Sequence, residues 1–355
     1  MKFTVAVLAG DGVGPEVVEA AIRVGSRAAE LGNAAVEWIP GAIGGAAIES
    51  DGDPLPESTL SLCRGADAVL LGAVGGPRWS DPNAAVRPEQ GLLRIRKAFD
   101  LFANLRPVKI FPALAPQAPL RPELLEGVDI LFVRELTSGI YFGPRQEENP
   151  AGEAWDTMRY SVEEVERVAR VAFEAARTRR RHVVSVDKAN VLASMRLWRR
   201  TISRVARDYP DVGLEHQLVD SFAMQQLTRP RDFDVVVTGN LFGDILSDAA
   251  AVLAGSLGML PSASLNGDGF GLYEPIHGSA PDIAGRKLAN PLGTILSVAL
   301  LFRHSLGLDR LATAIENAVE RALDSGARTR DIARGDEPTV TTDGMADVVL
   351  ESLHL

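Results

Sequence analysis

Residues 233–248, FDVVVTGNLFGDILSD, contain the pattern that decides the fold of this chain. The three valines at 235–237 form a short β-branched run, which predicts a buried strand. A Gly-Asn pair at 239–240 ends that run, and a helical pattern begins near Leu241. We therefore expect a strand that leads directly into a helix.

Asp244 and Asp248 lie four residues apart on this predicted helix, so their carboxylates leave the same face about one turn apart. Such a pair repels itself unless positive charge lies between the two groups. Oxygen ligands suit a hard divalent cation such as Mg²⁺ or Mn²⁺. Asp244 could instead favour the positive end of the helix dipole and Asp248 could be solvated, so the spacing alone leaves both readings open.

The composition is that of a soluble globular protein with two domains. The chain has 355 residues, of which 46% are hydrophobic and 24% charged. The net charge of −10 argues against a nucleic-acid partner. The lone Cys63 cannot form an intrachain disulfide, and no apolar run approaches the roughly 18 residues of a membrane helix. The first residues read as a strand rather than a signal peptide, and we expect a cytoplasmic protein.

Strands alternate with helices along the chain, which predicts the α/β class. Residues 2–9, 68–71, 128–133 and 182–186 read as strands. The segment 143–160 is polar and rich in Pro, Gly and Glu, so we expect a protruding loop or hairpin arm.

A helix is predicted directly after this arm. Ser161 followed by Glu164 matches a capping box, and apolar residues continue along one face at Val165, Val168 and Ala172.

The glycine-rich segment Gly10–Gly14 lies between a predicted strand and helix, where backbone N–H groups can bind phosphate. Its spacing does not match G-x-G-x-x-G, because Pro15 follows Gly14. A dinucleotide fingerprint is therefore disfavoured, while a phosphate-binding module remains an alternative.

Several charged residues are predicted at the ends of strands or in the turns that follow, where ligands of α/β sheets collect. They are Arg106, Arg134, Lys188 and Asp220. Together with Arg96, the arginines suit an acidic substrate, because a guanidinium makes a rigid two-pronged contact with a carboxylate. Nearby positive charges favour a neutral amine, so Lys188 is a candidate general base.

Eight segments, in the same order as in the family, closely resemble the isopropylmalate dehydrogenases of the β-decarboxylating dehydrogenase family, which also contains isocitrate dehydrogenase. The segments are GDGVGPEV, GAVGGP, GLLRIRK, FANLRP, VRELTSGIYFG, VDKANVL, VVTGNLFGDILSD and EPIHGSAPDIAG. The resemblance runs from about Phe3 to the last predicted helices.

The resemblance implies an isopropylmalate/isocitrate dehydrogenase-like two-domain α/β fold, with a central mixed sheet flanked by helices, that is not a Rossmann fold. The first domain, 1–101 with 254–355, would bind the cofactor. The second, 102–253, would supply the dimer interface, the arm and the metal and substrate residues. A homodimer with shared active sites is implied.

The implied activity is oxidation of the C2 hydroxyl of (2R,3S)-3-isopropylmalate by NAD⁺, with loss of CO₂, in leucine biosynthesis. Asp244 and Asp248 would hold Mg²⁺ or Mn²⁺ together with Asp220 of the other subunit. Lys188, also from that subunit, would be the base and Tyr141 the acid.

The remaining implied residues bind substrate and cofactor. Arg96, Arg106 and Arg134 would bind the substrate carboxylates, and Leu92, Leu93 and Val191 would form an apolar pocket that cannot satisfy a third carboxylate. NAD would contact Glu274, His277, Gly278, Ser279, Ala280, Pro281, Asp282, Asn290 and Asn190. The Asp282 carboxylate would accept ribose hydroxyls and repel a 2′-phosphate, and Ile283 stands where relatives that use NADP carry a basic–aromatic pair.

Other readings remain open. A tartrate/malate or homoisocitrate dehydrogenase is the alternative within the family. A catalytically inactive binding or regulatory subunit is the alternative from a different class.

Overall fold

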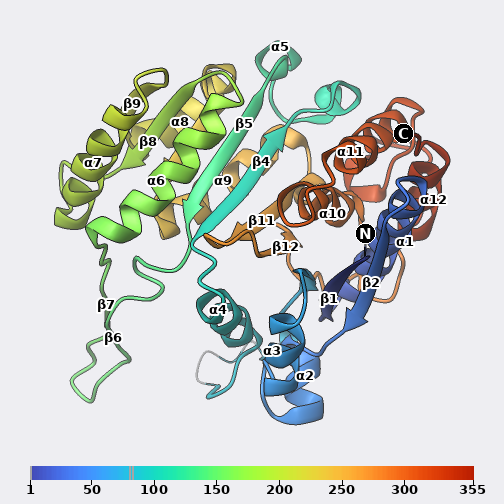
Figure 1. Ribbon diagram of the computed structural model, residues 1–355, viewed down its shortest axis with the longest axis horizontal. Helices are drawn as coiled ribbons and strands as arrows, with labels where there is room; N and C mark the ends of the chain where they lie inside the picture. The colour runs from blue at the N-terminus through green and yellow to red at the C-terminus, as the bar shows by residue number, and fades with distance from the viewer. Residues whose placement is uncertain (1, 80, 82–83) are drawn as a thin grey trace. The chain divides into compact units, whose positions relative to one another are not determined.

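The computed structural model describes residues 2–79, 81 and 84–355 (Figure 1). The chain divides into two compact units, each described here by itself. Unit 1 contains Met1–Phe99, Phe111–Ala118 and Ala254–Leu355, and unit 2 contains Asp100–Ile110 and Pro119–Leu253.

Unit 1 carries both chain ends and five strands in the order β2-β1-β3-β12-β11. β1 pairs in parallel with β2 and β3, β3 pairs in parallel with β12, and β12 pairs antiparallel with β11. The bounds are β1 Lys2–Gly10, β2 Ala35–Pro40, β3 Ala68–Ala73, β11 Pro261–Leu265 and β12 Gly271–Pro275.

The longer helices of unit 1 cover these strands. α1 and α10 pack against each other, and α10 is buried along nearly its whole length because most of its residues are apolar. The helices are α1 Gly14–Leu31, α2 Gly44–Asp51, α3 Glu57–Arg64, α4 Pro88–Ala98, α10 Leu292–His304, α11 Asp309–Asp324 and α12 Thr342–Glu351. Short 3₁₀ turns lie at Pro77–Trp79, Pro112–Gln117, Leu257–Met259 and Arg330–Ile332.

Unit 2 has five strands in the order β4-β5-β10-β8-β9. β4 runs antiparallel to β5, and the other neighbours are parallel. The bounds are β4 Ala103–Lys109, β5 Asp129–Glu135, β8 His182–Asp187, β9 Gly213–Leu218 and β10 Val235–Thr238. Each unit therefore contains a mixed arrangement of strands, as predicted.

The helices of unit 2 include the one predicted after the arm. They are α5 Pro122–Leu125, α6 Val162–Arg177, α7 Ala193–Val205, α8 Val219–Thr228 and α9 Asn240–Ala251, with 3₁₀ turns at Ala206–Asp208, Pro230–Asp232 and Val252–Ala254. Ser161 caps α6: its hydroxyl accepts the Glu164 N–H at 3.2 Å and its N–H donates to the Glu164 carboxylate at 2.6 Å. This confirms the predicted capping box.

The predicted arm is a hairpin. β6 Arg145–Gln146 pairs antiparallel with β7 Trp155–Asp156, and both strands are exposed. Figure 1 shows the hairpin extending beyond the helices of unit 2.

The β10–α9 connection also agrees with its prediction. Val235, Val236 and Val237 are fully buried, and extended backbone at Gly239 (φ −67°, ψ 166°) leads into α9. The helix begins at Asn240, one residue before the predicted start.

Several elements are absent from the prediction, among them the strands β2, β11 and β12 and the helices α2, α3, α4, α5, α8 and α12. β2 is partly exposed and lacks a continuous apolar run, and β11 (PSASL) is poor in β-branched and aromatic residues. Within the described residues, no helix is long and apolar enough to cross a membrane.

Candidate active site

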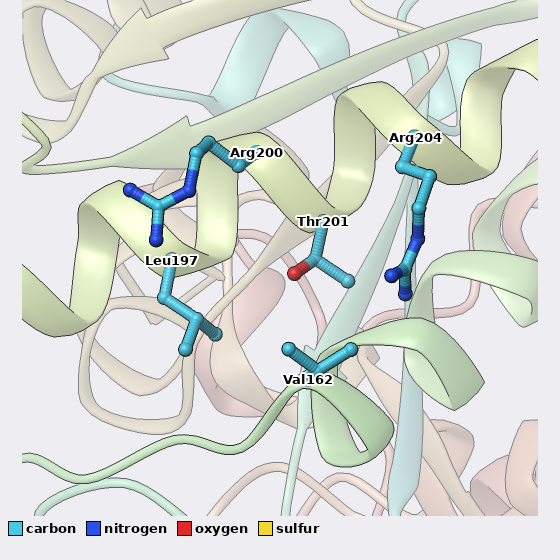
Figure 2. Close-up of a pocket in the computed structure, with 5 residues that line it drawn as sticks. All are labelled: Val162, Leu197, Arg200, Thr201 and Arg204. Carbon is cyan, nitrogen blue, oxygen red and sulfur yellow. The ribbon is translucent and has the colours of Figure 1, made fainter.

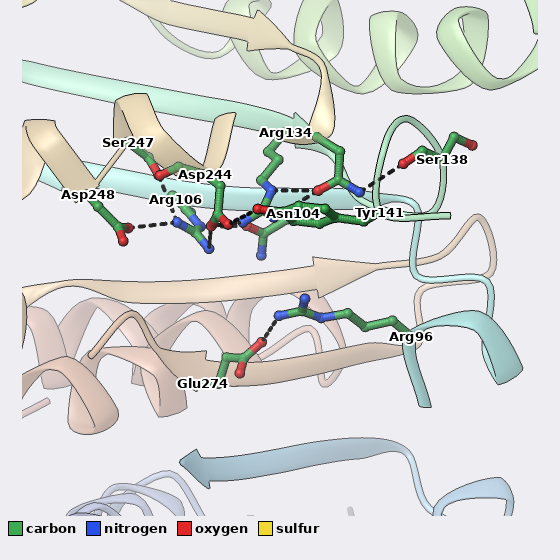
Figure 3. Close-up of polar contacts among 11 residues, drawn as sticks. Arg96, Asn104, Arg106, Arg134, Ser138, Tyr141, Asp244, Ser247, Asp248 and Glu274 are labelled. Carbon is green, nitrogen blue, oxygen red and sulfur yellow. Dashed lines mark hydrogen bonds and ion pairs between the residues drawn. The ribbon is translucent and has the colours of Figure 1, made fainter. Parts of the chain in front are cut away.

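Helix α9 presents a stripe of polar side chains on one face. Asn240, Asp244, Ser247 and Asp248 follow the i, i+4, i+7, i+8 spacing that lines one side of an α-helix. This face packs on β4 and β5. Both aspartates predicted from the sequence therefore point into the same polar cluster (Figure 3).

The strands beneath α9 supply two arginines and an asparagine. Asn104 and Arg106 are two residues apart on β4, and Asn104 lies opposite Arg134 of β5, so all three side chains emerge on one face. The expectation that Arg106 ends a strand is wrong: it lies in the middle of β4. The antiparallel register with β5 brings it beside Arg134.

Both guanidinium groups contact the α9 carboxylates. Arg106 donates to Asp248 at 3.1 Å and to Asp244 at 3.4 Å, and Arg134 makes a short ion pair with Asp244. The side chains of Arg106 and Arg134 are 8% and 2% exposed. Two buried cations thus balance two carboxylates, as a buried charge requires.

Tyr141 completes this cluster. Its hydroxyl donates to Asp244 Oδ2 at 2.8 Å, and the Arg134 guanidinium lies 5.8 Å from its ring centre. Burial, followed by the hydrogen bond to Asp244, raises the pKa of Tyr141 to about 12. The phenol therefore keeps its proton near neutral pH, which an acid catalyst needs.

The electrostatics of α9 fit a cation site. Burial is the main cause that raises the pKa of Asp248, and the charge of Asp244 adds to it, against the effect of Arg106. An added divalent cation would relieve the repulsion between these two oxygen donors. Among the described residues, no group of three or more acidic, His or Cys side chains forms a metal site within one chain.

Lys188 and Asp220 form a separate pair in unit 2. The Lys188 amine lies 2.8 Å from the Asp220 carboxylate, and this contact is the main cause that lowers the pKa of Asp220. Buried Asp187 fixes the turn after β8 by accepting from Ala189 N–H at 2.9 Å and from Arg199. The exposed side chains of Asn190 and Val191 follow, Val191 being 63% exposed.

In unit 1, α4 carries three of the predicted substrate residues. Leu92 and Leu93 are half-buried. Arg96 forms a buried ion pair with Glu274 of β12 at 2.9 Å, each side chain being 10% exposed. A predicted substrate residue and a predicted cofactor residue therefore contact each other.

The predicted cofactor segment follows β12. The His277 Nδ1 is 2.9 Å from the Gly278 carbonyl, while its buried Nε2 has no hydrogen-bond partner in the described part of the chain. Burial lowers the pKa of His277, so its imidazole is neutral near pH 7. Pro281 and Asp282 are exposed and Ser279 is buried. An orphaned ring nitrogen and an exposed acid on the same segment fit a nucleotide-binding segment.

Two other predicted cofactor residues are described by their backbone conformation or their hydrogen bonds. Ala280 has a left-handed backbone (φ 37°). Asn290 is 5% exposed, accepts the Leu292 N–H at 3.0 Å and donates to Asp331 at 3.1 Å.

The glycines at 10–14 have a structural explanation. Gly12 has φ 59°, and a Cβ there would lie 2.0 Å from the Ser279 carbonyl oxygen. The Val13 N–H donates to the same oxygen at 2.8 Å. The turn thus packs closely on the predicted cofactor segment.

A hollow of about 200 Å³ lies on unit 2 (Figure 2). Its lining consists of one residue of α6 and four of α7: Val162, Leu197, Arg200, Thr201 and Arg204. It contains no residue of the polar cluster beneath α9.

Four residues of the cluster were missed from the sequence. Asn104, Asn240 and Ser247 hydrogen-bond the two arginines, and Gly243 makes room for Arg134. The helical spacing of Asn240 and Ser247 with the two aspartates is a signal that could have found them. The position of Asn104 depends on strand register.

A sequence profile described as isocitrate/isopropylmalate dehydrogenase matches residues 4–349. The chain belongs to the isocitrate/isopropylmalate dehydrogenase family. It is therefore an oxidoreductase, and a divalent metal and NAD(P) are typical of this family.

Similar proteins of this family cover almost the whole chain. A 3-isopropylmalate dehydrogenase of Bacillus licheniformis is 55% identical over 345 residues, 96% of this chain and 93% of its own. Proteins of the same name from Rhodopirellula baltica and Aquifex aeolicus are 55% and 52% identical, covering 99% of this chain and 99% and 98% of their own.

Solved structures of the family share the fold. The crystal structure of isocitrate dehydrogenase from Methylococcus capsulatus is 33% identical, with a TM-score of 0.88 and 99% coverage of both chains. A β-decarboxylating dehydrogenase from Thermococcus kodakarensis in its apo form is 37% identical, with a TM-score of 0.79 and 99% and 96% coverage. The predicted fold class is thus confirmed.

Proposed function

We propose that this enzyme oxidises (2R,3S)-3-isopropylmalate with NAD⁺ and releases CO₂, 4-methyl-2-oxopentanoate and NADH, as a cytoplasmic enzyme of leucine biosynthesis. The assignment of the substrate rests on the 52–56% identity, over nearly the full length, to 3-isopropylmalate dehydrogenases of several organisms. Isocitrate dehydrogenase from Methylococcus capsulatus shares only 33%.

The substrate carboxylates bind to arginines. Arg106 and Arg134 have the buried, rigid positions that two-pronged recognition needs, and Arg96 is the third candidate. Substrate can replace the carboxylates that these arginines contact in its absence.

Asp244 and Asp248 of one chain, with Asp220 of a second, hold Mg²⁺ or Mn²⁺. The paired carboxylates on one face of α9 support this assignment. The bound cation would stabilise negative charge that develops on the substrate oxygens. A symmetric homodimer supplies the third aspartate to each site.

Proton transfer uses two side chains. Lys188 would accept the proton of the C2 hydroxyl, and bound NAD⁺ would supply the hydride acceptor for C2. After CO₂ has left, Tyr141 donates its proton to the enol carbon. The protonated state of Tyr141, with its pKa of about 12, supports the second role.

Substrate specificity rests on apolar side chains. Leu92, Leu93 and Val191 of a second chain surround the isopropyl group, and a third carboxylate buried there would be unpaired.

NAD binds along the segment from His277 to Asp282, with further contacts from Glu274, Asn290 and Asn190. The exposed Asp282 carboxylate supports NAD over NADP, because it repels a 2′-phosphate. The region formed by both chain ends, 1–101 and 254–355, is the cofactor-binding domain, and 102–253 supplies the dimer interface.

Turnover of three acids tests this function. NADH formation is measured with 3-isopropylmalate, D-malate and homoisocitrate, each with Mg²⁺ and again with excess chelator. We expect the highest kcat/KM with 3-isopropylmalate and loss of activity with chelator. Faster turnover of either other acid would reassign the substrate, and absence of NADH from all three would support a binding or regulatory role.

A further inference from the structure

Both arginines beneath α9 have neutral hydrogen-bond acceptors as well as acidic ones (Figure 3). The Nε and Nη2 of Arg134 donate to the Asn240 amide oxygen at 3.1 and 2.8 Å. Asn240 is fully buried, and its amide nitrogen donates to the Ser138 carbonyl at 3.0 Å. This second contact fixes the amide so that its oxygen faces the guanidinium.

Arg106 also has two neutral acceptors. Its Nε donates to the Asn104 amide oxygen at 2.7 Å, and its Nη1 donates to the Ser247 hydroxyl at 2.7 Å. Asn104 and Ser247 are both fully buried. Each guanidinium therefore makes two hydrogen bonds to groups that carry no charge.

A neutral acceptor fixes the direction of a guanidinium without cancelling its charge, whereas a carboxylate does both. Asp244 and Asp248 are carboxylates, but in the proposed function they bind the divalent cation. When the two aspartates bind the cation, the neutral acceptors can still orient the arginines and leave their charge for the substrate.

We propose that Asn104 and Asn240 are positioning residues, which keep Arg106 and Arg134 aimed at the substrate carboxylates with their positive charge intact. This inference rests on the proposed function, since it requires an anionic substrate at these arginines. It goes beyond that function by naming what orients the binding groups and why asparagine rather than aspartate stands there.

The alternative is a purely structural role. The Asn240 N–H donates to the Tyr160 hydroxyl at 2.8 Å at the start of α9, so Asn240 also helps to anchor the helix. A structural role would lower thermal stability without a selective change in substrate affinity.

Asn→Asp variants separate these roles, because they keep the size and the acceptor oxygen while adding the charge. For Asn240→Asp and Asn104→Asp we expect KM for 3-isopropylmalate to rise about tenfold or more. A change of this size corresponds to the loss of one charge-assisted contact. KM for NAD⁺ should change less than about twofold, since the predicted cofactor residues of unit 1 are unaltered. Asn266→Asp, in the turn between β11 and β12, adds the same charge as a control.

Binding provides a readout without turnover. Calorimetry with 3-isopropylmalate and Mg²⁺, but without NAD⁺, should show the same weakening for both variants. Unchanged substrate affinity in folded variants would overturn the positioning role. If the asparagine variants do not fold, Ser247→Ala should raise KM severalfold for the same reason, and an unchanged KM there would also overturn it.

Failure of the proposed function and failure of the positioning role are detected by different measurements. Wild-type turnover of 3-isopropylmalate tests the function, whereas only the variant-to-wild-type ratio tests the two asparagines. If another hydroxy-diacid proves to be the substrate, the same ratio is measured with that acid.

Discussion

Gly243 of α9 lies directly against the aliphatic stem of Arg134. A Cβ at position 243 would be 2.7 Å from Arg134 Cγ and 2.9 Å from its Cβ, closer than carbon atoms approach each other. The Arg134 side chain is 2% exposed and has little room to move. The absence of a side chain at position 243 therefore lets this arginine pass beneath the helix.

Gly243→Ala should weaken substrate binding, although alanine normally favours a helix by about 1 kcal/mol over glycine. We expect the clash to displace Arg134, raise KM for 3-isopropylmalate and lower the free energy of unfolding by about 1–3 kcal/mol. Steady-state kinetics and urea unfolding measure both. Gly267→Ala is the matched control, because no atom lies within 4 Å of a Cβ there. Equal behaviour of the two variants would contradict the packing argument.

Lys188→Ala should reduce turnover by at least about 100-fold, the usual contribution of a positioned general base. The variant should still fold and form the same oligomer, because Lys188 pairs with the exposed Asp220. Single-turnover NADH formation and gel filtration test the two expectations. Lys2→Ala removes a lysine from another surface ion pair, with Glu37, and should be active. Near-normal hydride transfer without Lys188 would remove it from the mechanism.

The four tyrosines should resist ionisation in the folded protein. Burial is the first cause that raises the pKa of Tyr141, Tyr160, Tyr209 and Tyr273. Near-ultraviolet absorbance at about pH 10, the usual tyrosine pKa, should show little tyrosinate until the protein is unfolded. Above that pH the unfolded state binds fewer protons, so the free energy of unfolding should fall as pH rises. About half-ionised tyrosine in folded protein would show that these rings are not buried.

Replacing Asp282 by Lys together with Ile283 by Tyr should shift cofactor preference from NAD toward NADP. The change removes a carboxylate that repels the 2′-phosphate and adds a cation that attracts it. The ratio of kcat/KM for the two cofactors is the measurement. Asp268→Lys, in an exposed turn of unit 1, provides a charge-matched control. An unchanged ratio in the double variant would count against the cofactor assignment.

Local patterns predicted much of the fold. The valine run of β10, the helical spacing of α9 and the capping box at Ser161 each depend on neighbours in sequence. The hairpin arm followed from its composition. The division into domains was expected from the family resemblance alone, since no local pattern contains it.

Long-range pairing limited the prediction of the site. Arg106 was expected at a strand end, but the antiparallel register of β4 and β5 places it mid-strand. Asn104 can be recognised as part of the polar cluster only from that register, which places it opposite Arg134. The Arg96–Glu274 pair joins residues 178 positions apart, and nothing local indicates it.

Hybrid dimers test most directly whether two chains build one metal site. Asp220→Asn and Asp244→Asn subunits, each inactive as homodimers, are coexpressed with different tags and purified as the hybrid. One site of each hybrid is then intact, so we expect about half of the wild-type activity. A hybrid of Asp244→Asn and Asp248→Asn subunits should stay inactive, because every site then carries a defect. A first hybrid no more active than its parents would contradict a site shared between chains.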